Sequence, residues 1–184
     1  LSSLGESIHH YFILELSADL IAWQKETIAT KVPHLKDKVI WLNELPHNFN
    51  GVILANEVLD AQPCELVSYQ DGVAIGLGVT YQDNKFSFKP CQLSPSAVHT
   101  VGQLALDYHD YITEIHIANQ GFVKALAENL AHGAVLLIDY GVSQAEYYHP
   151  QKARGSLRGF FRQHVLDDIL VYPGLIDITS SVNW

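Results

Sequence analysis

Residues 51–56, GVILAN, are an almost continuous apolar run of strand length that leads straight into Glu57 and Asp60. A strand that is apolar on both faces is typical of a parallel sheet whose two faces are both covered. The run therefore indicates an α/β protein. It also raises the question of why a buried strand should end in carboxylates.

Strands and helices alternate along the first third of the chain. Residues 11–16, YFILEL, predict a strand, Ser17 is a suitable N-cap for the helix that follows, and Pro33 stops that helix. Residues 37–45 predict a second strand before residues 51–58. This order of elements is that of an α/β sheet.

Residues 64–93 break this pattern. Their apolar residues recur with a period of two, and the dipeptides Asp-Gly at 71–72 and Asp-Asn at 83–84 favour hairpin turns. We therefore expect a small antiparallel hairpin insertion that leaves the parallel sheet. Residues 1–184 are otherwise expected to form a single domain.

The last part of the chain returns to longer elements. Helices are expected around residues 94–105 and 119–130, and residues 133–141, GAVLLIDYG, predict another apolar strand. Two strand-like pieces follow at 156–164 and 176–184. Two strands at the end of a parallel sheet often form its antiparallel edge, and we expect that arrangement here.

Three of the expected strands end in polar side chains, namely Glu15, Asn56 with Glu57, and Asp139. In an open parallel sheet, ligands bind outside the carboxyl ends of the strands. Glu15 has the position of an acid that accepts hydrogen bonds from ribose hydroxyls. A single acid at a strand end is more often a surface residue, but the cluster of Asn56, Glu57 and Asp60 favours a site.

Charge and cysteine content limit the partners and the compartment. The 184-residue chain has a formal net charge of -9, which disfavours nucleic acid and anionic membrane surfaces and favours a basic or neutral partner. No apolar run approaches the about 20 residues of a membrane-spanning helix, so no membrane span is expected. Cys64 and Cys91 have no metal-like spacing and suggest a reducing compartment, although a disulfide between them stays open.

Two further features are weaker. The Gly-Leu-Gly at 76–78 lies inside an alternating strand, so it indicates a packing feature rather than a phosphate loop. Arg162 and His164 lie on a late expected strand and face either a cleft or solvent. Ten histidines are present, but none pairs with another at the spacing of a metal site on one helix face, so no metal is expected.

Several stretches resemble a known family in the same order: NEVLDAQP, LLIDYG, EYYHP followed by GSLRGFFRQH, and PGLIDITSSVNW. Together they resemble the MidA family of S-adenosylmethionine-dependent methyltransferases. YFILELSADLIAWQ is similar to the family's second strand and its following helix. The family includes the mitochondrial methyltransferase that acts on an arginine of a respiratory complex I subunit during assembly. Gln62, Ser156 and Gln163 depart from the family pattern, which concerns only details of the acceptor site.

The resemblance implies a class I methyltransferase fold, with a Rossmann-like, mostly parallel sheet, and S-adenosylmethionine as cofactor. Glu15 would hold the ribose, the backbone near Trp41 and Leu42 would border the adenine, and Asn56 with Glu57 would lie beneath the methionine moiety.

For catalysis, the resemblance suggests that Glu57 and Asp60 orient the acceptor and take its proton, with Asp139 beside them. Tyr140, Arg162 and His164 would bind the acceptor. These roles apply to a basic protein or peptide acceptor, which is the expected partner.

Two other functions stay open: a non-catalytic assembly protein that keeps the fold, and a methyltransferase for small molecules. A bacterial cytoplasm or a mitochondrial matrix fits equally well. The family's first strand and glycine-rich loop are expected before Tyr11, where residues 1–10 resemble only the lead-in to the second strand. Since the sequence also contains no methionine, we expect a longer protein, and weak cofactor binding by residues 1–184 alone.

Overall fold

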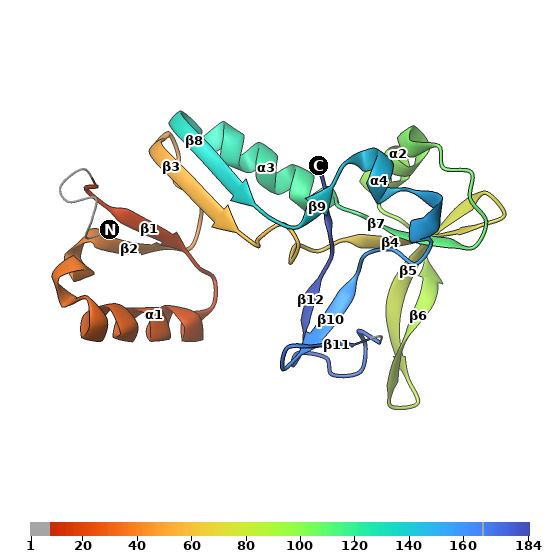
Figure 1. The fold of residues 1–184 in the computed structure, drawn as a ribbon, viewed down its shortest axis with the longest axis horizontal. Coiled ribbons are helices and arrows are strands. Elements are labelled where there is room, and N and C mark those ends of the chain that lie inside the picture. The colour runs from red at the N-terminus through yellow and green to blue at the C-terminus, as the bar shows by residue number, and fades with distance from the viewer. Residues whose placement is uncertain (1–7, 167) are drawn as a thin grey trace. The chain divides into compact units, whose positions relative to one another are not determined.

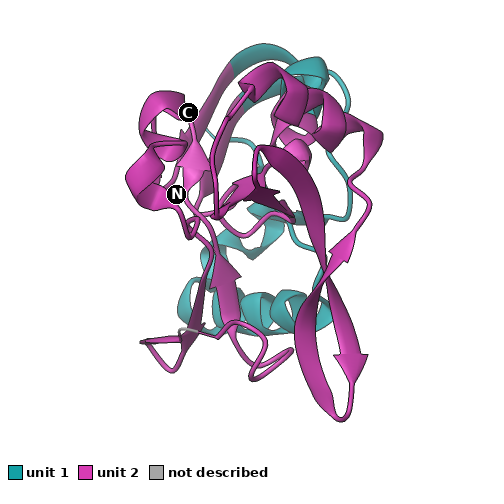
Figure 2. Ribbon diagram, turned by 90° about the vertical axis from the view of Figure 1, so that its right-hand side faces the viewer, with its two compact units in different colours: residues 1–51, 125–133 teal, residues 52–124, 134–184 magenta. Residues whose placement is uncertain are grey.

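The computed structural model describes residues 8–166 and 168–184. Two compact units are present, one formed by residues up to 51 together with 125–133, the other by 52–124 together with 134–184 (Figure 2). Two segments lie outside the described part. They are residues 1–7, which precede the first expected strand, and residue 167, which lies between the expected strands at 156–164 and 176–184.

The first unit contains a parallel strand–helix–strand arrangement (Figure 1). β1 (Tyr11–Leu14) pairs in parallel with β2 (Val39–Leu42), and α1 (Ala18–Lys31) with the 3-10 helix η2 (Pro33–Lys38) connects them. The Ser17 side chain caps α1 by accepting the Leu20 N–H at 3.3 Å. The predicted strands, N-cap and helix stop are therefore confirmed.

β3 (Phe49–Asn56) and β8 (Leu130–Ile138) form a separate two-stranded sheet. In Figure 1 they lie side by side with their arrowheads at the same end. The described strands form five sheets instead of the one mostly parallel sheet that was predicted. The single sheet is not seen because no strand in the described part of the chain pairs with both β1–β2 and β3–β8.

The second unit is built on an antiparallel sheet with the order β6-β5-β4-β7. Its strands are β4 (Glu65–Gln70), β5 (Val73–Gln82), β6 (Lys85–Cys91) and β7 (Tyr111–Ile115). The antiparallel strands expected over 64–93 are present, with Asp71, Asp83 and Asn84 in the left-handed conformation of tight turns. β7 was not predicted, because it buries the polar residues Thr113 and Glu114 and so lacks an alternating pattern.

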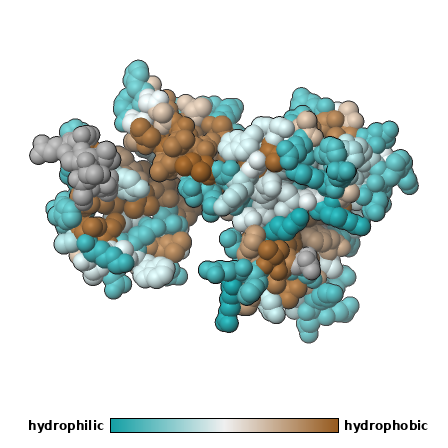
Figure 3. All heavy atoms as spheres, viewed as in Figure 1, coloured by the Kyte–Doolittle hydropathy of each residue, from teal (hydrophilic) through white to brown (hydrophobic). Residues whose placement is uncertain are grey.

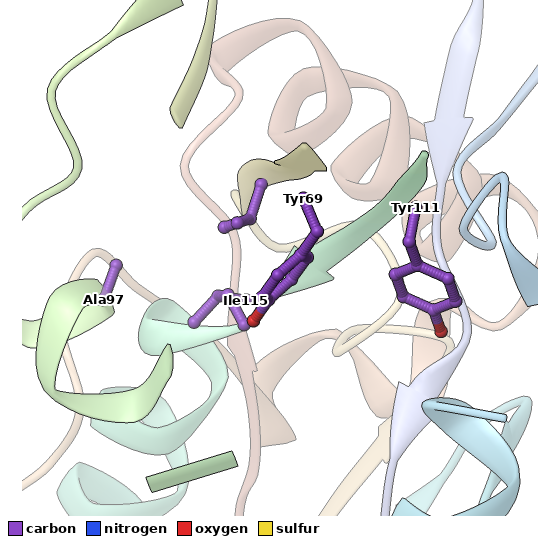
Figure 4. Packing of buried hydrophobic residues seen from close by; sticks show 5 residues of the cluster. Tyr69, Ala97, Tyr111 and Ile115 are labelled. Carbon is purple, nitrogen blue, oxygen red and sulfur yellow. The ribbon is translucent and has the colours of Figure 1, made fainter. Parts of the chain in front are cut away.

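The core of the second unit lies between this sheet and α2 (Pro95–Leu104). Val67, Tyr69, Ala97, Tyr111 and Ile115 are buried there, and Figure 4 shows four of them with their labels. The rings of Tyr69 and Tyr111 meet edge to face with centroids 6.2 Å apart, a favourable arrangement for an aromatic pair. This packing fixes α2 and β7, and hence the start of the helix after β7.

The remaining elements are short apart from α3 (Ile117–Asn129). β9 (Gly141–Val142) pairs in parallel with β13 (Val182–Asn183), while α4 (Gln144–Tyr147) and η3 (Pro150–Lys152) follow β9. β10 (Arg158–Phe161) pairs antiparallel with β11 (His164–Leu166) and β12 (Asp177–Thr179). The last two pieces therefore pair antiparallel, but in a sheet of their own and not at the edge of the parallel strands as expected. None of the helices in the described ranges has the length and apolar character that crossing a membrane requires.

Candidate functional site

Asp139 organises the turn that follows β3. One of its carboxylate oxygens, Oδ2, accepts the backbone N–H groups of Leu59 at 2.8 Å and Asp60 at 3.1 Å. The other, Oδ1, accepts the N–H of Tyr140 at 2.8 Å. With three backbone donors on its carboxylate, Asp139 holds the turn against the end of β8 rather than standing free as a base.

Glu57 lies at the start of this turn, directly after β3. Its backbone N–H donates to the Ile138 carbonyl at 2.8 Å, and its φ of 51° places it in the left-handed region that non-glycine residues rarely adopt. The exposed Tyr140 hydroxyl hydrogen bonds to the Glu57 carboxylate, and this bond is the main reason why the pKa of Tyr140 is raised. The strained turn therefore presents Glu57 and Tyr140 together.

Asp60 is the buried member of the same turn, with 8% of its surface exposed. Its Oδ1 has no hydrogen-bond partner among the described residues. Burial raises its pKa, and the negative charges of Asp139, Glu57 and Asp177 add to the rise. The backbone carbonyl of Asp60 accepts the Ser180 N–H at 3.0 Å, so the turn is also tied to the segment after β12. We refer to Glu57, Asp60 and Asp139 as the acidic turn.

An unpaired, buried carboxylate next to other acids favours a cationic ligand, because a positive charge would relieve both desolvation and repulsion. Asn56, the exposed last residue of β3, directly precedes this group. Arg162 and His164 are not brought to it. Arg162 occupies the β10–β11 turn with its guanidinium over the Phe161 ring, and His164 is exposed at the start of β11. In the described residues neither makes a hydrogen bond or ion pair with the acidic turn.

The first unit brings its predicted residues to the ends of its two parallel strands. The Glu15 N–H donates to the Leu42 carbonyl at 3.2 Å, and Glu15 Oε1 accepts the Ser17 N–H at 2.9 Å. The indole N–H of Trp41 donates to Gln24 Oε1 on α1 at 2.8 Å. The Trp41 side chain is thus occupied by α1, which agrees with assigning only the backbone near Trp41 and Leu42 to ligand contact.

Residues 2–184 match the family described as "Putative S-adenosyl-L-methionine-dependent methyltransferase". The chain belongs to this family. A comparison with curated proteins finds no match.

Two solved structures from Burkholderia thailandensis are similar to this chain. One is a COG1565 superfamily member that is described as a "likely methyl transferase" and is bound to S-adenosyl-homocysteine. It is 39% identical to this chain with a TM-score of 0.88, and the match covers 100% of this chain and 48% of that one. A native crystal structure from the same superfamily and organism has 39% identity, a TM-score of 0.90, and coverage of 100% and 49%. The chain therefore spans about half the length of the solved structures that it matches.

The chain also contains a buried polar cluster that the sequence did not reveal. Glu114 on β7 is 1% exposed, and its carboxylate accepts the Tyr147 hydroxyl at 2.6 Å, the N–H groups of Ser156 and Leu157 at 2.8 Å, and the Ser156 hydroxyl at 3.1 Å. His116 Nε2 lies 2.9 Å from the Tyr147 oxygen. The only sequence signal is an acid in a short segment that also contains Ile112 and Ile115, which by itself also fits a surface position.

Proposed function

We propose that the protein is an S-adenosylmethionine-dependent methyltransferase of the MidA type that methylates an arginine of a basic protein or peptide. The observation that carries the proposal is the acidic turn, in which Asp60 is buried without a partner for Oδ1 beside two further acids. Both the sulfonium of the cofactor and a guanidinium acceptor are cations, and each would be stabilised by such a turn.

The residues of each unit suit the cofactor chemically. Glu15 has one carboxylate oxygen, Oε2, beyond the bond that it makes to Ser17, and is suited to ribose hydroxyls. The backbone near Trp41 and Leu42 would border the adenine, and Asn56 with Glu57 would contact the methionine moiety. When bound, the cofactor supplies an electrophilic methyl group.

The acidic turn would then act on the acceptor. Glu57 and Asp60 would orient the guanidinium by charge-assisted hydrogen bonds, which is the largest part of what the protein must do in an in-line displacement. An arginine nitrogen that accepted the methyl group would lose a proton, and Asp60, whose pKa is raised and whose Oδ1 has no partner among the described residues, would be suited to take it. Asp139 is a positioning residue, and Tyr140 forms part of the acceptor wall.

Arg162 and His164 would bind the acceptor from the exposed β10–β11 hairpin, a finer assignment that has only their exposure in its favour. The link to respiratory complex I assembly rests on the resemblance to MidA. A bacterial cytoplasm or a mitochondrial matrix would each supply a basic protein acceptor.

Methyl transfer from labelled cofactor to arginine-rich peptides tests the proposal. The double variant Glu57→Gln, Asp60→Asn should lose at least about 100-fold in turnover, because it removes the charge that orients the acceptor and the proton acceptor together. Asp83→Asn, in the exposed β5–β6 turn, is the matched control and should keep full activity. Full turnover in the folded double variant would remove the acidic turn from the site, and cofactor binding without turnover on any basic peptide would favour a non-catalytic protein.

A further inference from the structure

A cavity of about 490 Å³ lies in the second unit, beside the first turn of α3. Residues from α2, α3, α4 and β13 line it, among them His99, His116, Asn119, Gln144 and Asn183. None of its lining residues is Asp, Glu, Lys or Arg. In an acidic chain, a cavity lined by amides, imidazoles and the hydroxyl residues Thr100 and Tyr148 points to a neutral, hydrogen-bonding occupant.

Four side-chain atoms on residues of this wall lack a hydrogen-bond partner in the described structure. They are His116 Nδ1, Asn119 Nδ2, Asn119 Oδ1 and Asn183 Oδ1. His116 and Asn119 are each 7% exposed, so these atoms face the cavity wall rather than open solvent. Buried polar groups are nearly always paired, and a concentration of unpaired ones around a single cavity indicates that something enters it.

The buried cluster behind the cavity determines what His116 offers. The Tyr147 hydroxyl gives its proton to the Glu114 carboxylate at 2.6 Å, so its oxygen must accept from His116 Nε2 at 2.9 Å. Nε2 therefore carries the proton of the neutral ring, and burial favours that neutral form by lowering the pKa of His116 against the opposing effect of Glu114. Nδ1 is then left with a free lone pair.

The unpaired atoms thus comprise three acceptors and one donor: His116 Nδ1, Asn119 Oδ1 and Asn183 Oδ1, with Asn119 Nδ2. An anion would meet mostly acceptors, with the Glu114 carboxylate behind them. A cation would leave the Asn119 donor unpaired and would face the positive end of the α3 dipole. A primary carboxamide offers two N–H donors and one carbonyl acceptor, which pair with two of the three acceptors and with the one donor and leave Asn119 Oδ1 without a partner.

We propose that this cavity binds a primary carboxamide group, with its NH₂ donating to His116 Nδ1 and Asn183 Oδ1 and its carbonyl accepting from Asn119 Nδ2 after rotation of the Asn119 side chain. The neighbouring hollow of about 500 Å³ between α2 and α3 shares His99 but has none of the unpaired residues on its wall, so it carries no such signal.

The carboxamide has two possible sources, a free small amide and the side chain of a glutamine or asparagine in a peptide. The second source is favoured by β13. Ser180, just before this strand, donates to the Asp60 carbonyl, and Asn183 lies three residues further, roughly 10 Å along an extended chain. A peptide at the acidic turn would therefore reach the cavity with a neighbouring side chain.

Nuclear magnetic resonance titration of the natural full-length protein tests the proposal independently of methyl transfer. The probes are acetamide, acetyl-Gly-Gln-Gly-N-methylamide, and the same peptide with Glu in place of Gln. The expected result is a saturable shift of the Asn119 and His116 side-chain resonances with acetamide or the Gln peptide, and at least tenfold weaker binding of the Glu peptide. Tighter binding of the Gln peptide than of acetamide identifies a peptide as the source, and the reverse identifies a free amide.

Asn119→Leu is the matching variant, because it removes the unpaired amide without a large change in size. It should fold with unchanged or higher thermal stability, since an unsatisfied group is lost, and it should abolish the shifts at His116. Gln82→Leu, on an exposed stretch of β5, removes an amide elsewhere and should bind like the natural protein. Absence of a saturable shift with both amide probes, equal binding of the Glu peptide, or undiminished binding by Asn119→Leu would overturn the proposal and leave a cavity that holds only solvent.

Discussion

At the residue scale, the acidic turn separates side chains that the sequence presents as equivalent. Asp139 has three backbone donors on its carboxylate, whereas Asp60 is buried with an unpartnered oxygen and Glu57 is exposed beside Tyr140. The sequence indicates that acids gather at strand ends. It does not show which of them is used up by backbone N–H groups, because that depends on the conformation of a five-residue turn.

Asp60→Asn should change how stability depends on pH. The pKa of Asp60 is raised in the folded state, so folding favours its protonated form. The stability that protonated Asp60 contributes is complete below the ordinary pKa of about 4, and it is lost as pH rises through the folded-state pKa. The variant cannot ionise, so it should unfold at a higher temperature than the natural protein at pH 7, and the gap should shrink towards pH 3.5. Thermal unfolding across this range checks the prediction, and parallel curves for the two proteins would contradict it.

Asp139→Ala should destabilise the second unit, because the N–H groups of Leu59, Asp60 and Tyr140 lose their acceptor. We expect a loss of about 2 to 4 kcal/mol in the free energy of unfolding, measured by urea denaturation. Asp139→Asn keeps one acceptor oxygen, so its free energy of unfolding should lie between those of the natural protein and the alanine variant. A loss below about 0.5 kcal/mol in the alanine variant would show that the bonds do not hold the turn.

At the element scale, the sequence predicted individual helices and strands better than it predicted which strands pair. The Ser17 cap, the apolar period and the dipeptide turns gave β1, α1 and β4 to β6, since each depends on neighbours in sequence. β7 was not predicted because it contains the buried Glu114. The hydrogen-bond donors to the Glu114 carboxylate are Tyr147 and residues 156–157, which lie 33 or more positions away in the sequence. The α/β class was predictable from local patterns, but the division of the described strands into five sheets was not, because strand partners lie far apart in the sequence.

Gly155 provides a test of the Glu114 cluster. Its φ is 68°, and an added Cβ would overlap the Glu114 carboxylate. Gly155→Ala should therefore lower the free energy of unfolding through both backbone strain and displacement of Glu114, by about 2 to 4 kcal/mol. Gly174→Ala is the matched control, with a φ of 79° and open space around the added Cβ, so it should cost only about 1 kcal/mol. Equal losses in urea denaturation would mean that the contact with Glu114 contributes nothing.

At the scale of the whole molecule, one face of the β3–β8 sheet is apolar and exposed. Val52 and Leu54 on β3 are 71% and 61% exposed, and Leu136 and Ile138 on β8 are 52% and 47% exposed. Figure 3 shows apolar side chains gathered over this part of the chain. Exposed apolar side chains on neighbouring strands are typical of surfaces that take part in interactions.

The most direct test of the methyltransferase account is calorimetric titration of S-adenosylhomocysteine into the natural full-length protein, alongside Glu15→Gln and the exposed α1 control Glu26→Gln. The account predicts micromolar binding, about -8 kcal/mol, to the natural protein and the control, and at least tenfold weaker binding to Glu15→Gln, because its carboxylate holds the ribose. No binding to the folded natural protein, or equal affinity in all three, would contradict it.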